Sequence, residues 1–241
     1  MKRGLSGRRS KNSHSAQKEN INWMIIVTTY IQLIKNNKME QEKLKKEPVS
    51  ELKLRAFTGN FLSPDAIVIG EEIKKGDTVA DFGCGNGFFT LPLARRVGEK
   101  GKVYAIDILT TPLAAVGSKA FVAKYDNIET IRADLERKNS LAKAIKNEQC
   151  QLVFIANALC TAKKKKTMLQ EAHRILAPKG KLIIVEWTKG VSQAFYNFGP
   201  KMNSRFTEEE LQELVIKYGF KLVDRFGAGE FHFGMKFRKK K

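Results

Sequence analysis

The sequence predicts an α/β fold in which helices cover both faces of a mainly parallel β-sheet. From residue 62 onward, short apolar segments typical of strands alternate with segments whose apolar residues recur at helical spacing. One glycine-rich loop joins such a strand to the helix that follows it. The segment 151–157 carries a continuous apolar run, as in a strand that is buried on both faces. Strands that alternate with helices are joined by crossovers, so they form a parallel sheet.

The predicted elements follow one another in a regular order. A late helix begins with a capping box, because Glu210 stands three residues after Thr207. The last two strands are joined through Gly227-Ala228-Gly229 as a hairpin, which places one antiparallel strand in or beside the sheet. We expect helices at 64–73, 88–97, 112–125, 162–176 and 207–219, and strands at 78–82, 102–108, 127–132, 151–157, 181–187, 220–225 and 231–237.

Composition indicates one globular domain with an appendage. The chain has 241 residues, of which 42% are hydrophobic and 29% charged, so it can bury a core. The three cysteines lack the spacing of a metal site and are too few for a disulfide framework, which points to a reducing compartment and a cytoplasmic protein. The three histidines lie far apart, which excludes an HExxH site, and no metal site is expected.

Much of the net charge of +19 lies near the two ends of the chain. Residues 1–47 hold 11 Lys and Arg against 4 Asp and Glu, and residues 236–241 hold five basic residues and no acid. We interpret 1–47 as a basic, poorly packed extension, 48–238 as the folded domain and 239–241 as a basic tail. Such tails attract nucleic acid or anionic lipid, although a solvated end would have the same composition.

The N-terminal segment contains an apolar run of 14 residues, 21–34. A membrane-spanning helix needs about 20 apolar residues, so no stable membrane span is expected. The run follows a basic segment, as in a secretory signal, but no small-residue cleavage site follows it. It would also suit an amphipathic helix. The simplest interpretation is that Met39 is the natural start and that residues 1–38 have no function.

The glycine-rich loop carries most of the predicted chemistry. Gly83, Gly85 and Gly87 follow a strand and open a helix, which is the context of a nucleotide-binding loop. A dinucleotide fingerprint would place glycine where Phe88 stands, and no Lys-Ser/Thr pair follows, which excludes a triphosphate loop. A purely structural turn would have a similar sequence.

Aspartates at three successive strand ends strengthen the prediction. Asp107 stands 20 residues after Gly87, where a carboxylate accepts hydrogen bonds from ribose hydroxyls. Asp134 is expected to accept the exocyclic amine of adenine while Leu135 packs on the ring, and Asp81 to face an ammonium group. Each acid alone would also suit a helix N-cap. Together, beside a loop without phosphate-binding features, they indicate a cationic nucleoside.

The segments VADFGCGNGFFTLPLA, YAIDI, IRADL, FIANAL and ILAPKGKLIIVEW resemble the successive motifs of class I S-adenosylmethionine-dependent methyltransferases. The chain is most similar to the type 11 group, related to quinone-biosynthesis C-methyltransferases, over residues 60–238. The resemblance implies a Rossmann-like seven-stranded sheet in the order 3-2-1-4-5-7-6, with strand 7 antiparallel, and S-adenosyl-L-methionine as cofactor. It assigns cofactor contacts to Asp81, Gly83, Gly85, Gly87, Asp107, Ile108, Asp134 and Leu135, with Asn157 near the transferable methyl group.

Catalytic residues are harder to predict, because a sulfonium is already an activated electrophile and needs mainly positioning. A base is required only for an acceptor that arrives protonated. Glu186 ends a strand, and Glu230 and His232 begin the antiparallel strand that returns to the same edge, so these three are the candidates. His232 would equally suit a surface or hydrogen-bonded structural role.

The acceptor is predicted from aromatic residues after the fifth strand, namely Trp187, Phe195, Tyr196 and Phe198. They favour a small apolar or planar molecule, although simple core packing would use the same residues. The lysine run 163–166 and the basic tails support an alternative, either an RNA methyltransferase or a non-catalytic basic RNA-binding domain. The acceptor's identity and the oligomeric state stay open.

Overall fold

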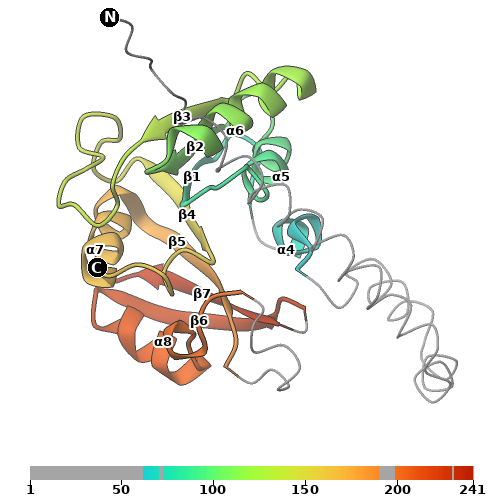
Figure 1. The fold of residues 1–241 in the computed structure, drawn as a ribbon. Coiled ribbons are helices and arrows are strands. Elements are labelled where there is room, and N and C mark those ends of the chain that lie inside the picture. The colour runs from blue at the N-terminus through green and yellow to red at the C-terminus, as the bar shows by residue number, and fades with distance from the viewer. Residues whose placement is uncertain (1–61, 71–72, 190–198, 230, 241) are drawn as a thin grey trace, which may run out of the picture. The chain divides into compact units, whose positions relative to one another are not determined.

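The computed structural model describes residues 62–70, 73–189, 199–229 and 231–240 (Figure 1). A seven-stranded sheet has the order β3-β2-β1-β4-β5-β7-β6, which confirms the predicted topology. The strands are β1 (Thr78–Phe82), β2 (Lys102–Asp107), β3 (Ile128–Arg132), β4 (Cys150–Ala156), β5 (Leu176–Trp187), β6 (Phe220–Gly227) and β7 (His232–Lys239). The helices are α4 (Pro64–Gly70), α5 (Thr90–Val97), α6 (Thr110–Ala123), α7 (Lys165–Ile175), α8 (Glu208–Ile216) and the short 3-10 helix η2 (Met202–Ser204).

Strand pairing places the carboxyl ends of β1 to β5 at one edge of the sheet. These five strands pair in parallel, whereas β7 runs antiparallel between β5 and β6. The predicted hairpin is therefore present, and β7 begins beside the end of β5, with His232 opposite Trp187. Residue 230, between the two hairpin strands, lies outside the described residues.

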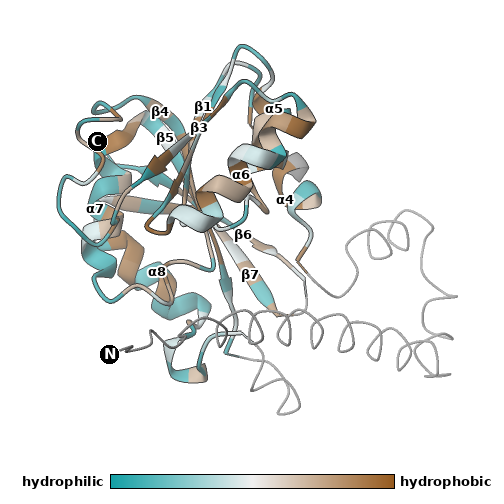
Figure 2. Ribbon diagram, turned by 45° about the horizontal axis from the view of Figure 1, so that its top comes forward, coloured by the Kyte–Doolittle hydropathy of each residue, from teal (hydrophilic) through white to brown (hydrophobic). Residues whose placement is uncertain are grey.

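The core lies on both faces of the sheet because alternate strand residues point in opposite directions. Phe82, Ile155 and Ile184 belong to a cluster that α7 and α8 cover, whereas Phe154 and Val185 belong to a cluster that α4 and α5 cover. Figure 2 shows hydrophobic residues along α5 and the neighbouring strands. This two-sided burial explains why the segment predicted at 151–157 is apolar.

Several element boundaries differ from the prediction. The helix expected from residue 88 begins at Thr90, because the turn of the glycine loop continues through Phe88 and Phe89. The helix expected from 162 begins at Lys165. β5 begins at Leu176, not at residue 181, because Leu176 pairs with Cys150 before an irregularity restores the register. Within the described part of the chain, no helix is long and apolar enough to cross a membrane.

The predicted capping box is present at the start of α8. The Thr207 hydroxyl accepts a hydrogen bond from the Glu210 backbone N–H at 3.2 Å, and the Glu210 carboxylate accepts one from the Thr207 N–H at 2.9 Å. The predicted N-terminal extension, the possible start at Met39 and the domain boundary after residue 47 lie outside the described residues and stay predictions.

Candidate functional site

The glycine loop turns sharply at the end of β1. Gly83, Gly85 and Gly87 have φ values of +71°, +49° and +84°, a left-handed region that favours glycine. A Cβ on Gly83 would lie 2.7 Å from the Cβ of Ala158, so this glycine allows the loop to approach the segment after β4. A Cβ on Gly85 would meet nothing within 4 Å, so open space lies beside this residue.

Asp107 holds the glycine loop against the end of β2. One carboxylate oxygen accepts a hydrogen bond from the Gly85 N–H at 3.0 Å, and the other accepts one from the Leu109 N–H at 2.9 Å. These two contacts fix the direction of the carboxylate at the strand end. The contact to Gly85 was not predicted, because it joins residues 22 positions apart whose proximity depends on the pairing of β1 with β2.

Asp81 is buried beneath the same loop. The Thr90 hydroxyl donates a hydrogen bond of 2.6 Å to its carboxylate. Burial raises the pKa of Asp81 to about 7, although the Thr90 hydrogen bond opposes this effect and the charge of Asp107 adds to it. The role of Thr90 was not predicted from the sequence. The only indication was its position at the start of the helix that follows the glycine loop.

Six of the nine predicted cofactor residues line one hollow of about 290 Å³ at the carboxyl edge of the sheet. Asp134 is exposed there, and one of its oxygens accepts a hydrogen bond from the Glu136 N–H at 2.9 Å. Met168 of α7 also lines this hollow and was not predicted. The predicted residues on its wall are Gly83, Asp107, Ile108, Asp134, Leu135 and Asn157; Asp81, Gly85 and Gly87 are not on it.

Asn157 and Glu186 shape the wall between β4 and α7. Asn157 adopts a left-handed φ of +56°, and its N–H donates to the Val185 carbonyl at 2.9 Å. Glu186 is completely buried, and its Oε1 accepts hydrogen bonds from the N–H groups of Leu159 at 2.9 Å and Cys160 at 3.1 Å. Glu186 therefore faces the segment after β4, and burial raises its pKa to about 7.

Two oxygen atoms in this wall accept no hydrogen bond from the described residues. They are Oδ1 of Asn157 and Oε2 of Glu186, both shielded from solvent. A buried polar atom without a partner costs free energy, and such atoms often mark functional positions. Asn157 itself is one of the residues that line the hollow.

Trp187 and His232 lie together where β5 ends and β7 begins. Their ring centroids are 4.2 Å apart, and the guanidinium of Arg205 lies 5.3 Å from the centre of the Trp187 ring. All three side chains are buried, so His232 is not a surface residue. Burial, helped by the charge of Arg205, lowers the pKa of His232 to about 4, so this imidazole is neutral at pH 7.

Arg205 is a residue of this edge that the sequence reasoning missed. Its Nε donates a hydrogen bond to the Pro200 carbonyl at 3.0 Å. In the sequence, only its position next to the capping box of α8 could have drawn attention to it. Four of the predicted residues, Phe195, Tyr196, Phe198 and Glu230, lie outside the described residues. Within the described ranges, no group of three or more His, Cys, Asp or Glu side chains could hold a metal ion.

Comparisons with known proteins identify the family. A family model described as a methyltransferase domain matches residues 73–219. A 2-phytyl-1,4-naphthoquinone methyltransferase of Nostoc sp. is 32% identical over 159 residues, 65% of this chain and 62% of that protein. A ubiquinone/menaquinone biosynthesis C-methyltransferase of Escherichia fergusonii is 28% identical over 157 residues, 65% of this chain and 54% of that protein. The chain thus spans about three fifths of the Nostoc relative's length.

Solved structures give the same fold. A methyltransferase from Aquifex aeolicus, described as SAM-dependent, superposes with a TM-score of 0.67 at 24% identity, covering 82% of this chain and 97% of its own. The sheet order, the glycine loop at the end of β1 and the matched family model point to one assignment. The chain belongs to the methyltransferase domain family and has the fold of the class I S-adenosylmethionine-dependent methyltransferases.

Proposed function

We propose that this chain transfers a methyl group from S-adenosylmethionine to a small planar acceptor at the carboxyl edge of the sheet. The observation that carries the proposal is the hollow of about 290 Å³ at that edge. Its wall combines Gly83 of the glycine loop with residues at the ends of three further strands, including Asp107, Asp134 and Asn157. In open α/β sheets, ligands bind outside the carboxyl ends of the strands.

The residues present fit this cofactor. Open space beside Gly85 leaves room for a ligand to approach the loop backbone. Asp107 would accept hydrogen bonds from ribose hydroxyls, and Asp134 and Leu135 would hold adenine. Asn157 would lie near the transferable methyl group. Asp81, at the end of β1, would face the ammonium group, and that cation would favour the ionised carboxylate. When bound, the cofactor supplies an activated methyl electrophile.

The protein's own work is then positioning and desolvation. Glu186 holds the segment from Asn157 to Cys160 through two backbone hydrogen bonds, so we assign it a positioning role. His232 is the candidate for accepting a proton, because it lies beside Trp187 and its imidazole is neutral. Its lowered pKa makes it a weak base, so it would accept a proton only from a strongly acidic group. Trp187 is buried against His232 and Arg205, so it would support the acceptor side of the site rather than line it.

A reduced quinone ring is the acceptor class that we propose. The Nostoc relative is named as a naphthoquinone methyltransferase, and the Escherichia relative is named for ubiquinone and menaquinone biosynthesis. An electrophilic methyl group needs an electron-rich carbon, which the hydroquinone form has and the oxidised quinone lacks. The ring carbon would bond to the methyl carbon as the sulfur–methyl bond breaks and its electron pair stays on sulfur. The ring would release its proton to a base, for which His232 is the candidate.

Calorimetry with S-adenosylhomocysteine tests the cofactor site. We expect full-length protein to bind it, and Asp107→Ala and Gly85→Val to lose binding. Asp107→Ala removes the carboxylate that would accept hydrogen bonds from the ribose. Gly85→Val places a side chain in the open space beside a residue whose φ is +49°. Asp126→Ala, at an exposed position outside the hollow, is the matched control and should bind as wild type. Unchanged binding in both site variants would contradict the assignment.

Labelled S-adenosylmethionine then tests the acceptor. Incubation with 1,4-naphthoquinol should transfer label to the extracted ring compound, whereas oxidised 1,4-naphthoquinone should take up none. Replacement of Phe195 or Tyr196 by Ala should lower turnover and leave cofactor affinity nearly unchanged, if these aromatics admit the acceptor. Label in neither compound would exclude this acceptor class while leaving the cofactor result intact.

RNA methylation is the second candidate, and one observation favours it. Lys163, Lys164 and Lys166 are exposed and closely follow Thr161 and Ala162, which line the hollow. Basic residues beside a methyl-transfer site would hold an RNA backbone. Label recovered only in an RNA fraction would favour this candidate, and it should fall when the three lysines are changed to Gln. A non-catalytic RNA-binding domain would instead bind RNA and ignore S-adenosylhomocysteine.

A further inference from the structure

Three basic side chains lie side by side across the sheet, at the end opposite the methyl-transfer edge. Lys181 of β5 is directly opposite Arg238 of β7, and Arg238 is directly opposite Lys221 of β6. Directly opposed residues project from the same face, and neighbouring strands are about 4.8 Å apart, so this basic row spans about 10 Å. Like charges at opposed positions destabilise a sheet, so folding stability does not explain the row.

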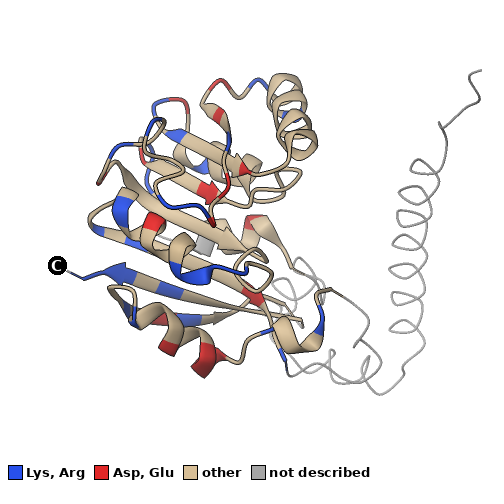
Figure 3. Cartoon of the chain, turned by 60° about the vertical axis from the view of Figure 1, so that its left-hand side comes forward, with Lys and Arg blue, Asp and Glu red and all other residues tan. Residues whose placement is uncertain are grey.

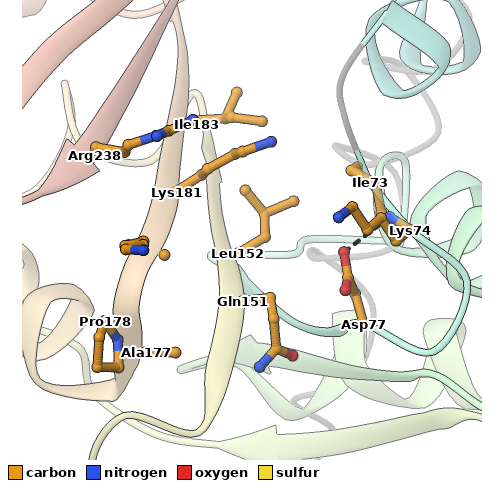
Figure 4. Close-up of a pocket in the computed structure, with 12 residues that line it drawn as sticks. Ile73, Lys74, Asp77, Gln151, Leu152, Ala177, Pro178, Lys181, Ile183 and Arg238 are labelled. Atoms are coloured by element: carbon orange, nitrogen blue, oxygen red, sulfur yellow. Dashed lines mark hydrogen bonds between the residues drawn. The ribbon is translucent and has the colours of Figure 1, made fainter.

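Two adjoining hollows surround the basic row. The first, of about 310 Å³, is lined by Lys181 and Arg238, and Figure 4 shows these two on one wall with Lys74 and Asp77 on the other. The second hollow, of about 770 Å³, shares Arg238 with the first and includes Lys221. Its further basic residues are Lys179, shared with the first hollow, Lys239 and Lys240.

Several of the basic side chains on the two walls have no acidic partner among the described residues. The acids on the two walls are Asp77 and Glu148. Asp77 accepts a hydrogen bond from the Lys74 backbone N–H at 2.8 Å, and Glu148 pairs with Lys239 at 3.0 Å. Figure 3 shows Lys and Arg gathered on the strand that leads to the C-terminus. Four of the lysines on the two walls form no ion pair in the described part of the chain: Lys74, Lys179, Lys221 and Lys240. The buried Nε–H of Arg238 donates no hydrogen bond to the described residues.

We propose that the basic row and its two hollows bind the phosphate backbone of a nucleic acid strand. A row of cations at spacings of a few ångströms matches a chain of phosphates, and neutralising phosphates is the main source of non-specific affinity. The surface is recessed, which suits a strand better than a flat bilayer. The large apolar residues on the walls, Ile73, Leu152 and Ile183, are buried and cannot insert into a membrane.

The chemistry of the walls also sets what the surface can recognise. Apart from His173, neither hollow is lined by an aromatic side chain, so no platform for stacking bases is present on these walls. Binding should therefore follow phosphate contacts and show little base preference. Because the methyl-transfer hollow lies at the other end of the strands, nucleic acid and cofactor should bind without competing.

Fluorescence anisotropy of the full-length chain with a labelled oligouridine tests the proposal. The test variant combines Lys181→Gln, Lys221→Gln and Arg238→Gln. The matched control combines Lys124→Gln, Lys138→Gln and Lys143→Gln, which removes three exposed charges outside both hollows and leaves both basic tails in place. At about 0.1 M salt we expect a loss of about tenfold for the test variant, with the slope of log K against log salt reduced by about 2. The control should lose much less.

Several results would overturn the proposal. They are equal affinity of the test variant and wild type, a larger loss in the control variant, or binding to phosphatidylserine vesicles without binding to the oligonucleotide. A DNA oligomer of the same length should bind similarly, since the phosphates are shared. The single variant Lys221→Gln, at an exposed position, should lower affinity for the oligonucleotide about threefold. It provides a test of the proposal if the triple variant fails to fold.

Discussion

Asp81 and Glu186 are two buried carboxyl groups near the carboxyl ends of β1 and β5, where burial raises the pKa of each to about 7. They have different partners: Asp81 accepts a hydroxyl hydrogen bond from Thr90, whereas Glu186 accepts two backbone hydrogen bonds from Leu159 and Cys160. A side chain that satisfies two buried N–H groups holds its loop, whatever its part in proton transfer.

The Glu186 carboxyl makes folding stability depend on pH. Its pKa is raised from the ordinary value of 4.5 to about 7, so its contribution to stability is complete below pH 4.5 and is lost as pH rises to about 7. Glu186→Gln removes this titration and should retain Oε1 as acceptor. Urea unfolding across this range should show wild type losing stability relative to Glu186→Gln, with a constant difference above pH 7.

Glu186→Ala should differ from the Gln variant. It leaves the N–H groups of Leu159 and Cys160 buried without an acceptor, at a cost of about 1–3 kcal/mol for each. The exposed Glu209→Gln is the control and should not change the pH dependence in this window. Equal stability of the Gln and Ala variants at every pH would show that the two backbone hydrogen bonds do not hold the loop.

The contact between the glycine loop and the segment after β4 joins two elements of the candidate site. A Cβ on Gly83 would collide with the Cβ of Ala158 at 2.7 Å, and no other side chain lies within 4 Å of that position. The collision is thus a specific pair that a double-mutant cycle can isolate. The close approach of Gly83 to Ala158 links the glycine loop, which would contact the cofactor, to the segment that Glu186 holds.

We expect Gly83→Ala to destabilise the fold and weaken S-adenosylhomocysteine binding. Adding Ala158→Gly should restore part of both losses, because it removes the atom in collision; the strain at φ of +71°, about 1 kcal/mol, remains. Gly117→Ala in α6 is the control: its Cβ meets nothing within 4 Å, so it should raise stability by about 0.5–1 kcal/mol. Additive effects at Gly83 and Ala158 would contradict the coupling.

Element types were predictable because they follow from local chemistry. The glycine loop, the capping box at Thr207 and the hairpin all appear as expected. Their boundaries were less predictable: β5 begins at Leu176 because pairing with Cys150 overrides the turn signal of Pro178 and Gly180. A strand can extend through such residues where a neighbouring strand supplies the register.

The whole chain contains more than the described domain, and residues 1–38 stay predicted as an extension without function. A chain that begins at Met39 should therefore bind S-adenosylhomocysteine with unchanged affinity and melt at the same temperature. Differential scanning fluorimetry and calorimetry on both lengths would check this. A large fall in melting temperature would mean that the apolar run 21–34 packs on the domain.

The cytoplasmic location also stays a prediction. The three cysteines on which it rests are free thiols in the structure.

Sequence alone determined the α/β class, the glycine loop and the aspartates at strand ends, because periodicity and turn chemistry act between near neighbours. The family resemblance supplied the strand order, which the structure confirms. Only the tertiary structure decided that Glu186 faces Leu159 and Cys160, that Arg205 lies over Trp187, and that Lys181, Lys221 and Arg238 form one row. These contacts depend on the register between strands far apart in the chain, which local patterns do not encode.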